Sequence, residues 1–176
     1  HLIESTGMKI LVATEKPFAK EAVDGIRRIV EDAGYELALL EKYTDKAQLL
    51  AAVADVDALI VRSDKVTAEV IGAAKNLKIV VRAGAGYDNV DLAAATARGI
   101  VVMNTPGQNS NAVAELALAM MVFMSRNRFT PGTGSEIQGK TLGIHAYGNV
   151  GKLVGRKGKA LGMNVIAYDP FITDAA

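Results

Sequence analysis

Short aliphatic runs alternate with longer amphipathic stretches from Met8 to about residue 104. The runs are apolar at consecutive positions, which is typical of strands buried on both faces of a parallel sheet. The amphipathic stretches repeat their apolar residues every three or four positions, as helices that cover such a sheet do. Residues 8–104 are therefore predicted to form a flavodoxin-like, doubly wound α/β domain. Its strands are expected at 10–12, 37–40, 58–61, 79–81 and 100–103.

Helices are expected between these strands, and several of their ends carry recognisable signals. The first spans 20–33, with its apolar residues on one face and Gly34 as a C-terminal stop. Thr44 is the expected N-cap of the second helix, and Asp91 is the expected N-cap of the fourth. The third helix is expected over 67–74. These helices would cover both faces of the sheet.

A different pattern begins after residue 104. A nearly all-apolar helix is expected over 112–124, followed by a loop over 126–139 that contains proline and glycine. The methionines of this helix fit a core or a subunit interface better than a cofactor contact. The apolar faces of the helix predict a homodimer. A strand, a helix and a second strand follow. Two strands cannot bury both faces of their sheet, so residues 105–176 are predicted to be an incomplete Rossmann NAD-binding domain with only its first βαβ unit.

The turn between the strand and the helix of that unit reads A-x-G-x-x-G from Ala146 to Gly151. Gly148 would let the backbone approach a pyrophosphate, and Gly151 would let the helix pack closely on the strand. Free N–H groups at the helix N-terminus favour phosphate. Asp169, after the second strand, suits a ribose diol. Ala146 replaces the first glycine of the motif, and we expect a negative φ there.

Composition excludes several classes of partner. A formal net charge of +1 does not indicate a nucleic acid or a membrane surface, and no stretch is apolar enough to span a bilayer. The chain has no cysteine, so it has no disulfide framework, which suits a cytoplasmic location. No metal-ligand spacing is present. Residues 1–7 are interpreted as a tag remnant, because Met8 begins a native-like start.

Polar clusters follow three strands of the first domain, where ligands bind in open parallel sheets. They are Arg62-Ser63, the segment 82–89 and the segment 104–111. The guanidinium group suits carboxylate or phosphate because it donates two parallel hydrogen bonds. Small residues at 83–86 would leave backbone N–H groups open to an anion. Each arginine alone fits a solvated loop charge equally well.

These strings resemble the D-2-hydroxyacid dehydrogenase family. The likeness rests on Arg62-Ser63, on R-A-G-A-G-Y-D-N-V-D over 82–91 and on N-T-P-G-Q-N-S-N-A-V-A-E-L over 104–116. The segment 139–144 and the glycine turn after it also resemble this family. The likeness covers residues 8 to about 172, and it is closest to the branch that acts on 3-phosphoglycerate.

The resemblance implies a substrate-binding domain over 8–104 and an NAD-binding domain in the remaining chain. The residues implied to hold the substrate anion are Arg62, Ser63, Arg82, Ala83 and Gly84. The residues implied to contact NAD are Ala85, Tyr147, Gly148, Asn149, Val150, Gly151, Asp169 and Pro170. The implied partner is a phosphorylated 2-hydroxy acid. Asn149 departs from the family, many members of which carry arginine there, and the loop over 126–139 is shorter than in many members.

No catalytic residue is expected in this chain. The family's catalytic arginine, glutamate and histidine lie downstream of the second Rossmann strand, so the 176-residue chain alone is expected to be inactive. His145 is the one histidine outside residues 1–7, and strand histidines are more often packed than catalytic. Two alternatives stay open: an NAD-sensing, corepressor-like interaction protein of the same fold, and an α/β module without a ligand.

Overall fold

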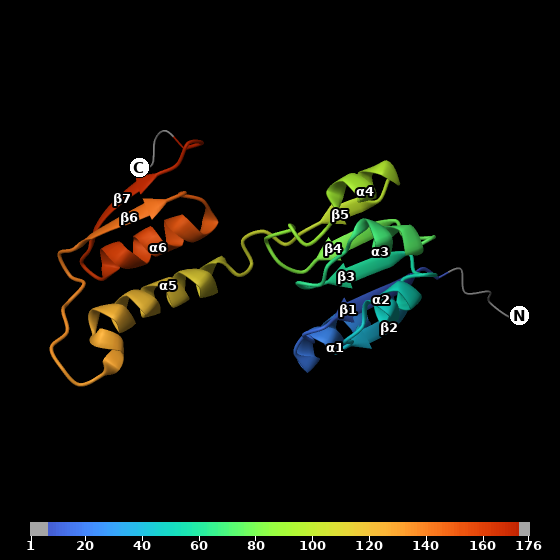
Figure 1. Cartoon of the computed structure of the whole chain (residues 1–176), viewed down its shortest axis with the longest axis horizontal. Coiled ribbons are helices and arrows are strands. Elements are labelled where there is room, and N and C mark those ends of the chain that lie inside the picture. The colour runs from blue at the N-terminus through green and yellow to red at the C-terminus, as the bar shows by residue number, and fades with distance from the viewer. Residues whose placement is uncertain (1–6, 173–176) are drawn as a thin grey trace, which may run out of the picture. The chain divides into compact units, whose positions relative to one another are not determined.

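The computed structural model describes residues 7–172, which form two compact units that divide between Pro106 and Gly107 (Figure 1). Residues 1–6, which hold most of the suggested tag remnant, lie outside the described residues. Within the described part of the chain, no helix is long and apolar enough to cross a membrane.

The first unit is built on a five-stranded sheet in the order β2-β1-β3-β4-β5. All of its strand pairs are parallel. This is the flavodoxin-like order, so the predicted fold class is confirmed. The strands are β1 (Lys9–Thr14), β2 (Glu36–Glu41), β3 (Ala58–Val61), β4 (Ile79–Arg82) and β5 (Val101–Met103).

Four helices connect these strands: α1 (Lys20–Asp32), α2 (Lys46–Ala52), α3 (Ala68–Ala73) and α4 (Leu92–Ala97). Leu11 and Ala13 of β1 belong to the main core cluster, while Val12 between them points to the opposite face and is also fully buried. Ile60 of β3 and Val81 of β4 follow Val12 in register on that opposite face. Both are only half-buried, so this face is less completely covered at β3 and β4 than at β1.

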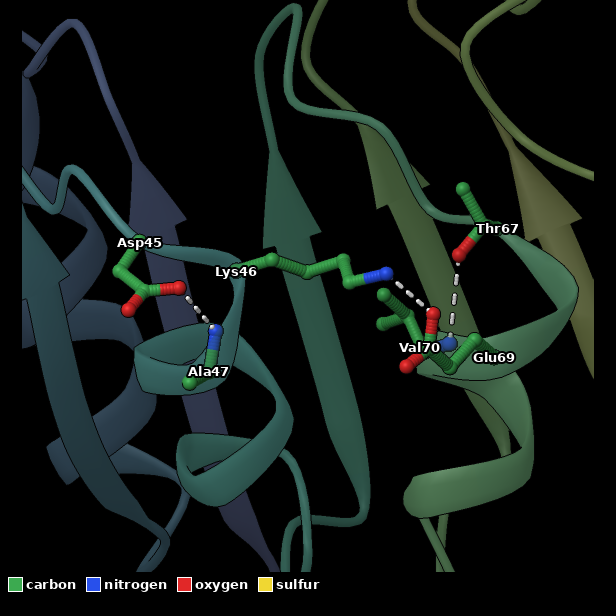
Figure 2. A network of polar contacts seen from close by, with 6 residues as sticks. All are labelled: Asp45, Lys46, Ala47, Thr67, Glu69 and Val70. Carbon is green, nitrogen blue, oxygen red and sulfur yellow. Dashed lines mark hydrogen bonds and ion pairs between the residues drawn. The ribbon is translucent and has the colours of Figure 1, made fainter.

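Helix caps explain most of the helix starts in this unit (Figure 2). Thr67 accepts a hydrogen bond from the Val70 amide at 3.4 Å, and Asp91 caps α4 as predicted. The prediction of Thr44 for α2 is wrong, because Asp45 is the N-cap and accepts from the Ala47 amide at 2.9 Å. Gln48 completes a capping box by accepting from the amides of residues 44 and 45.

A salt bridge between Lys46 and Glu69 joins the first turns of α2 and α3, as Figure 2 shows. Both side chains are more than half exposed, so this pair adds little to stability by itself. The two helices are held mainly by buried residues beneath them, including Leu49 and Val70.

The second unit contains α5 (Ser110–Ser125), a 3₁₀ turn (Asn127–Phe129), β6 (Thr141–His145), α6 (Asn149–Ala160) and β7 (Asn164–Tyr168). Strands β6 and β7 pair in parallel, as a βαβ unit requires. The long helix begins two residues before the predicted start, because Ser110 and Asn111 form its first turn.

The core of the second unit is small. Ala114 and Leu118 of α5 pack with Val154 of α6, and Leu142 and Ile144 of β6 lie against this cluster. The other face of the two-stranded sheet is open, with Ile166 and Tyr168 each more than 60% exposed. The predicted incomplete burial of this sheet agrees with that exposure.

Candidate functional site

The two arginines of the candidate anion site lie at the carboxyl ends of neighbouring strands. Arg62 follows β3 directly, and Arg82 is the last residue of β4, paired in register with Val61. Adjacent parallel strands therefore place both residues at the same edge of the sheet, which is the edge where ligands bind in this class of fold.

The Arg62 side chain is held in place by the loop after β1. Its Nη1 atom donates to the carbonyl oxygens of Lys16 and Pro17, both at 3.0 Å. The guanidinium carbon lies 5.3 Å from the centre of the Phe18 ring, within cation–π range. Only one terminal nitrogen is used in these bonds, so the rest of the fork is available to an anion.

The Arg82 side chain folds back over its own loop. Its Nη1 atom donates to the Ala83 carbonyl at 2.8 Å, and a Cβ at position 84 would lie 1.6 Å from the same nitrogen. Glycine at 84 therefore leaves the space that this guanidinium group occupies. To bind an anion beyond the sheet edge, Arg82 would have to move away from this position.

The backbone of the R-A-G-A-G loop is largely paired inside the protein. The Ala83 amide donates to Val61 and the Gly84 amide donates to Arg82, both at 2.8 Å. The prediction that the amides of Ala83 and Gly84 are open to an anion is therefore wrong for this conformation. The Gly84 carbonyl accepts from the Thr105 amide at 2.8 Å, and the Ala85 carbonyl accepts from the Asn104 side chain at 2.7 Å.

Unpaired buried polar atoms gather at the same edge. Among the described residues, the buried side-chain atoms without a hydrogen-bond partner are Thr14 Oγ1, Arg82 Nε and Asn89 Oδ1. Thr14 ends β1 and is fully buried, while Arg82 ends β4 and Asn89 lies in the next loop. Buried polar groups are normally paired, so the carboxyl edge is the part of this unit where buried side-chain polar atoms of the described residues lack protein partners.

The glycine turn of the second unit leaves the N-terminus of α6 open. Gly148 is the N-cap of α6, and no side chain caps the helix there. A Cβ at 148 would meet no other atom within 4 Å, so the space in front of the turn is open. The first N–H groups of α6 are thus left without a side-chain cap, as at anion-binding helix N-termini.

Gly151 makes the close approach that the motif predicts. A Cβ at this position would lie 2.3 Å from the carbonyl oxygen of Ala146 and 3.2 Å from the Ile144 side chain. The helix therefore rests directly on the backbone that leaves β6. The prediction for Ala146 is wrong, because its φ is +80°. The turn needs the left-handed conformation that glycine would supply at no steric cost, and alanine adopts it with strain.

Replacing Ala146 with glycine should stabilise the second unit by about 1 kcal/mol, because it removes a Cβ from a left-handed position. Urea unfolding of the chain would measure the change. Ala167→Gly in β7 is the matched control, and it should cost about 0.5–1 kcal/mol, as glycine does within a strand. Equal losses in the two variants would mean that Ala146 carries no strain.

Asp169 braces the same turn from the end of β7. One carboxylate oxygen accepts from the Tyr147 amide at 2.7 Å, and the other accepts from the Phe171 amide at 2.9 Å. The amides of Phe171 and Tyr147 lower the pKa of Asp169 below its usual value. Each oxygen keeps a further lone pair that can accept from a ribose hydroxyl.

The lowered pKa of Asp169 has a defined effect on stability. A carboxylate with a lower pKa in the folded state stabilises that state above the unfolded pKa of about 3.9. This contribution is lost as the pH falls through the folded pKa. The brace on the turn is therefore intact at neutral pH.

The remaining predicted cofactor residues have different surroundings. The Tyr147 side chain packs against α6, where a Cβ at Gly155 would lie 3.1 Å from its hydroxyl oxygen and 3.2 Å from its ring. Val150 packs on the small core of the second unit, whereas Asn149 and Pro170 are exposed. Tyr147 and Val150 would thus contribute backbone rather than side chain to a cofactor.

His145 lies at the end of β6 and is exposed, with its ring centre 5.6 Å from that of Tyr168. The predicted substrate residues all belong to the other unit. No group of three or more potential metal ligands occurs in residues 7–172.

Several residues that support the site lie in the polar clusters predicted at 82–89 and 104–111, but their supporting roles were not predicted from the sequence. Asn104 and Thr105 hold the carbonyls of the R-A-G-A-G loop, and the Asn89 side chain donates to the carbonyls of Arg62 and Asp64. All are short polar residues just beyond strand ends. That position was the available signal, but their partners could not be deduced from spacing.

Comparison with known proteins assigns the chain to a family. The family described as "D-isomer specific 2-hydroxyacid dehydrogenase, catalytic domain" matches residues 12–176. The chain belongs to this family. It is 43% identical to D-3-phosphoglycerate dehydrogenase of Archaeoglobus fulgidus, over 94% of this chain and 33% of that protein. It is also 43% identical to hydroxypyruvate reductase of Thermotoga maritima, over 77% of this chain and 49% of that protein.

The fold agrees with solved members of the family. The crystal structure of NAD⁺-bound 3-phosphoglycerate dehydrogenase from Entamoeba histolytica matches with a TM-score of 0.93 and 52% identity. That match covers 97% of this chain and 56% of the other. The chain spans between a third and a half of the length of the two relatives above.

Proposed function

We propose that this chain is the N-terminal portion of an NAD-dependent D-2-hydroxyacid dehydrogenase that oxidises 3-phosphoglycerate to 3-phosphohydroxypyruvate, a step of serine biosynthesis. The observation that carries the proposal is the uncapped N-terminus of α6 behind the open turn at Gly148, with Asp169 fixed beside it. Family membership and the similarity to 3-phosphoglycerate dehydrogenases support the substrate class.

The residues present fit the proposed cofactor. The amides at the start of α6 would bind the pyrophosphate, and Asp169 would accept hydrogen bonds from the adenosine ribose. Bound NAD would supply the acceptor for the hydride that leaves C2 of the hydroxy acid. Arg62 and Arg82 would hold the carboxylate or phosphate of the substrate, with Ser63, Ala83 and Gly84 beside them. We assign the proton transfer to no residue of this chain.

Steady-state kinetics of the complete enzyme would test this function. NADH formation from 3-phosphoglycerate should be far more efficient than from D-glycerate, because an anion site built on two arginines favours the phosphorylated acid. The 176-residue chain alone should show no turnover. Binding of NAD by the complete protein without turnover of any D-2-hydroxy acid would favour the NAD-sensing alternative instead.

Asp169 predicts a preference for NAD over NADP, because its carboxylate would repel a 2′-phosphate at close range. In the complete enzyme, Asp169→Ala should narrow this preference by about tenfold or more. Asp169→Asn is the matched variant, since it removes the charge and keeps one oxygen for the turn. A wild-type enzyme that prefers NADP would contradict this role.

The complete enzyme is expected to be a homodimer that associates through α5. Leu116, Met120 and Met124 of this helix are each more than half exposed. A largely apolar groove of about 990 Å³, lined by Met120, Met124, Leu142 and Val154 among others, lies in the same unit. Such a surface is typical of an interface.

Sedimentation velocity would measure the association. The double variant Met120→Lys, Met124→Lys should be monomeric, because it places two charges on the apolar face of α5. A monomeric wild-type enzyme at high micromolar concentration would contradict the prediction.

A further inference from the structure

Asp64 is a buried carboxylate at the candidate anion site, and only 5% of its surface is exposed. Its Oδ1 atom accepts from the Glu15 amide and from the Tyr43 hydroxyl, each at 2.7 Å. Its Oδ2 atom accepts from the Arg62 amide at 3.2 Å. A buried carboxylate is stable only when its oxygens are paired in this way.

The three donors come from three separate loops. Glu15 follows β1, Tyr43 follows β2 and Arg62 follows β3. These strands are neighbours in the sheet, so one side chain ties together the segments that leave its carboxyl edge. Burial, and then the hydrogen bond to Asp64, raise the pKa of Tyr43 far above its usual value, so its hydroxyl remains a donor at any physiological pH.

The bonds around Asp64 converge on Arg62. The Arg62 amide donates to Asp64, and its carbonyl accepts from the Asn89 side chain at 3.1 Å. Its guanidinium group is held by the carbonyls of Lys16 and Pro17, in the loop whose Glu15 amide also donates to Asp64. The backbone and the side chain of this arginine are thus both aligned through the loop that Asp64 anchors.

We propose that Asp64, supported by Tyr43, is a positioning residue that sets Arg62 for binding the substrate anion. This inference rests on the proposed function. Asp64 is itself buried and makes no contact with substrate in this scheme. It acts by fixing the Arg62 backbone relative to the loop that holds the guanidinium group.

The test is Asp64→Asn in the complete enzyme. The amide has one acceptor oxygen, and Oδ1 already serves two donors, so the NH₂ group would face the Arg62 amide. We expect kcat/KM for the hydroxy acid to fall about tenfold through KM, with KM for NAD unchanged. Tyr43→Phe removes one donor and should raise the same KM by a smaller factor, about threefold. If Asp64→Asn fails to fold, the KM of Tyr43→Phe still tests the proposal.

Asp57→Asn is the matched control. Asp57 accepts from the Lys9 amide at 2.9 Å and from Lys78 at 3.1 Å, but it precedes β3 and so lies at the opposite edge of the sheet. This variant should lose thermal stability and keep KM. Equal changes of KM in the variants at 57 and 64 would overturn the proposal, because they would reflect general loosening of the unit.

A double-mutant cycle with Arg62→Gln gives the sharpest test. If Asp64 acts through Arg62, Asp64→Asn should have almost no further effect on KM in the Arg62→Gln background. Fully additive effects would refute the proposal. An inactive wild type, or an Arg62→Gln enzyme with unchanged KM, would refute the proposed function of the site. A normal KM in the variants at 43 and 64, with an impaired Arg62→Gln enzyme, would refute only the positioning role.

Discussion

Replacing Gly151 with alanine should destabilise the second unit by at least about 1–3 kcal/mol. The added Cβ would lie 2.3 Å from the Ala146 carbonyl oxygen, and real Cβ atoms essentially never approach another atom within 3.0 Å. The obstacle is backbone rather than the end of a flexible side chain, so α6 would have to move away from β6. Because α6 presents the proposed pyrophosphate site, NAD binding by the complete enzyme should fall with stability.

Gly143→Ala provides the control for this prediction. Gly143 lies in β6, close to Gly151 in the fold, but a Cβ there would meet no atom within 4 Å. Its replacement should leave the stability of the chain unchanged or raise it slightly. Urea unfolding of the 176-residue chain would compare the two variants. Equal stabilities would show that the helix can shift without cost.

The periodicity of apolar residues predicted the elements of the fold well, because burial on both faces of a parallel sheet leaves consecutive apolar runs. The runs at 58–61 and 79–81 lie within β3 and β4 as observed. Helix caps were harder to predict where two candidate residues were adjacent, as at the start of α2. Asp45, not Thr44, caps α2: its side chain accepts from the Ala47 amide, while the Gln48 side chain accepts from the amides of residues 44 and 45.

The details of the site depended on backbone geometry that composition does not specify. Ala146 was expected to keep a negative φ because of its Cβ, yet the close contact between the turn and Gly151 accompanies a φ of +80°. Similarly, the Ala83 amide continues the pairing of β4 with β3 beyond the last strand residue. Small residues in a loop therefore did not mean free amides, and Asp64 could be recognised only once the loops it joins were placed.

In the complete enzyme, Arg62→Gln and Arg82→Gln should each raise KM for 3-phosphoglycerate about ten- to a hundredfold, the effect of losing a charge-assisted pair. The two arginines differ in whether the observed conformation of the side chain is ready to bind the substrate anion. Arg62 is already fixed by two carbonyls and by Phe18, whereas Arg82 rests on its own loop. Binding by Arg82 must first break its bond to the Ala83 carbonyl, so its variant should show the smaller increase.

Arg98→Gln is the control for both variants. Arg98 donates to the carbonyls of Ala74 and Lys75 at the end of α3, and its bonds serve the fold. It follows α4 at the amino end of β5, away from the edge that carries Arg62 and Arg82. This variant should be less stable to heat and keep its KM. An unchanged KM in both site variants would mean that Arg62 and Arg82 are solvated loop charges, and the substrate anion would have to be held elsewhere.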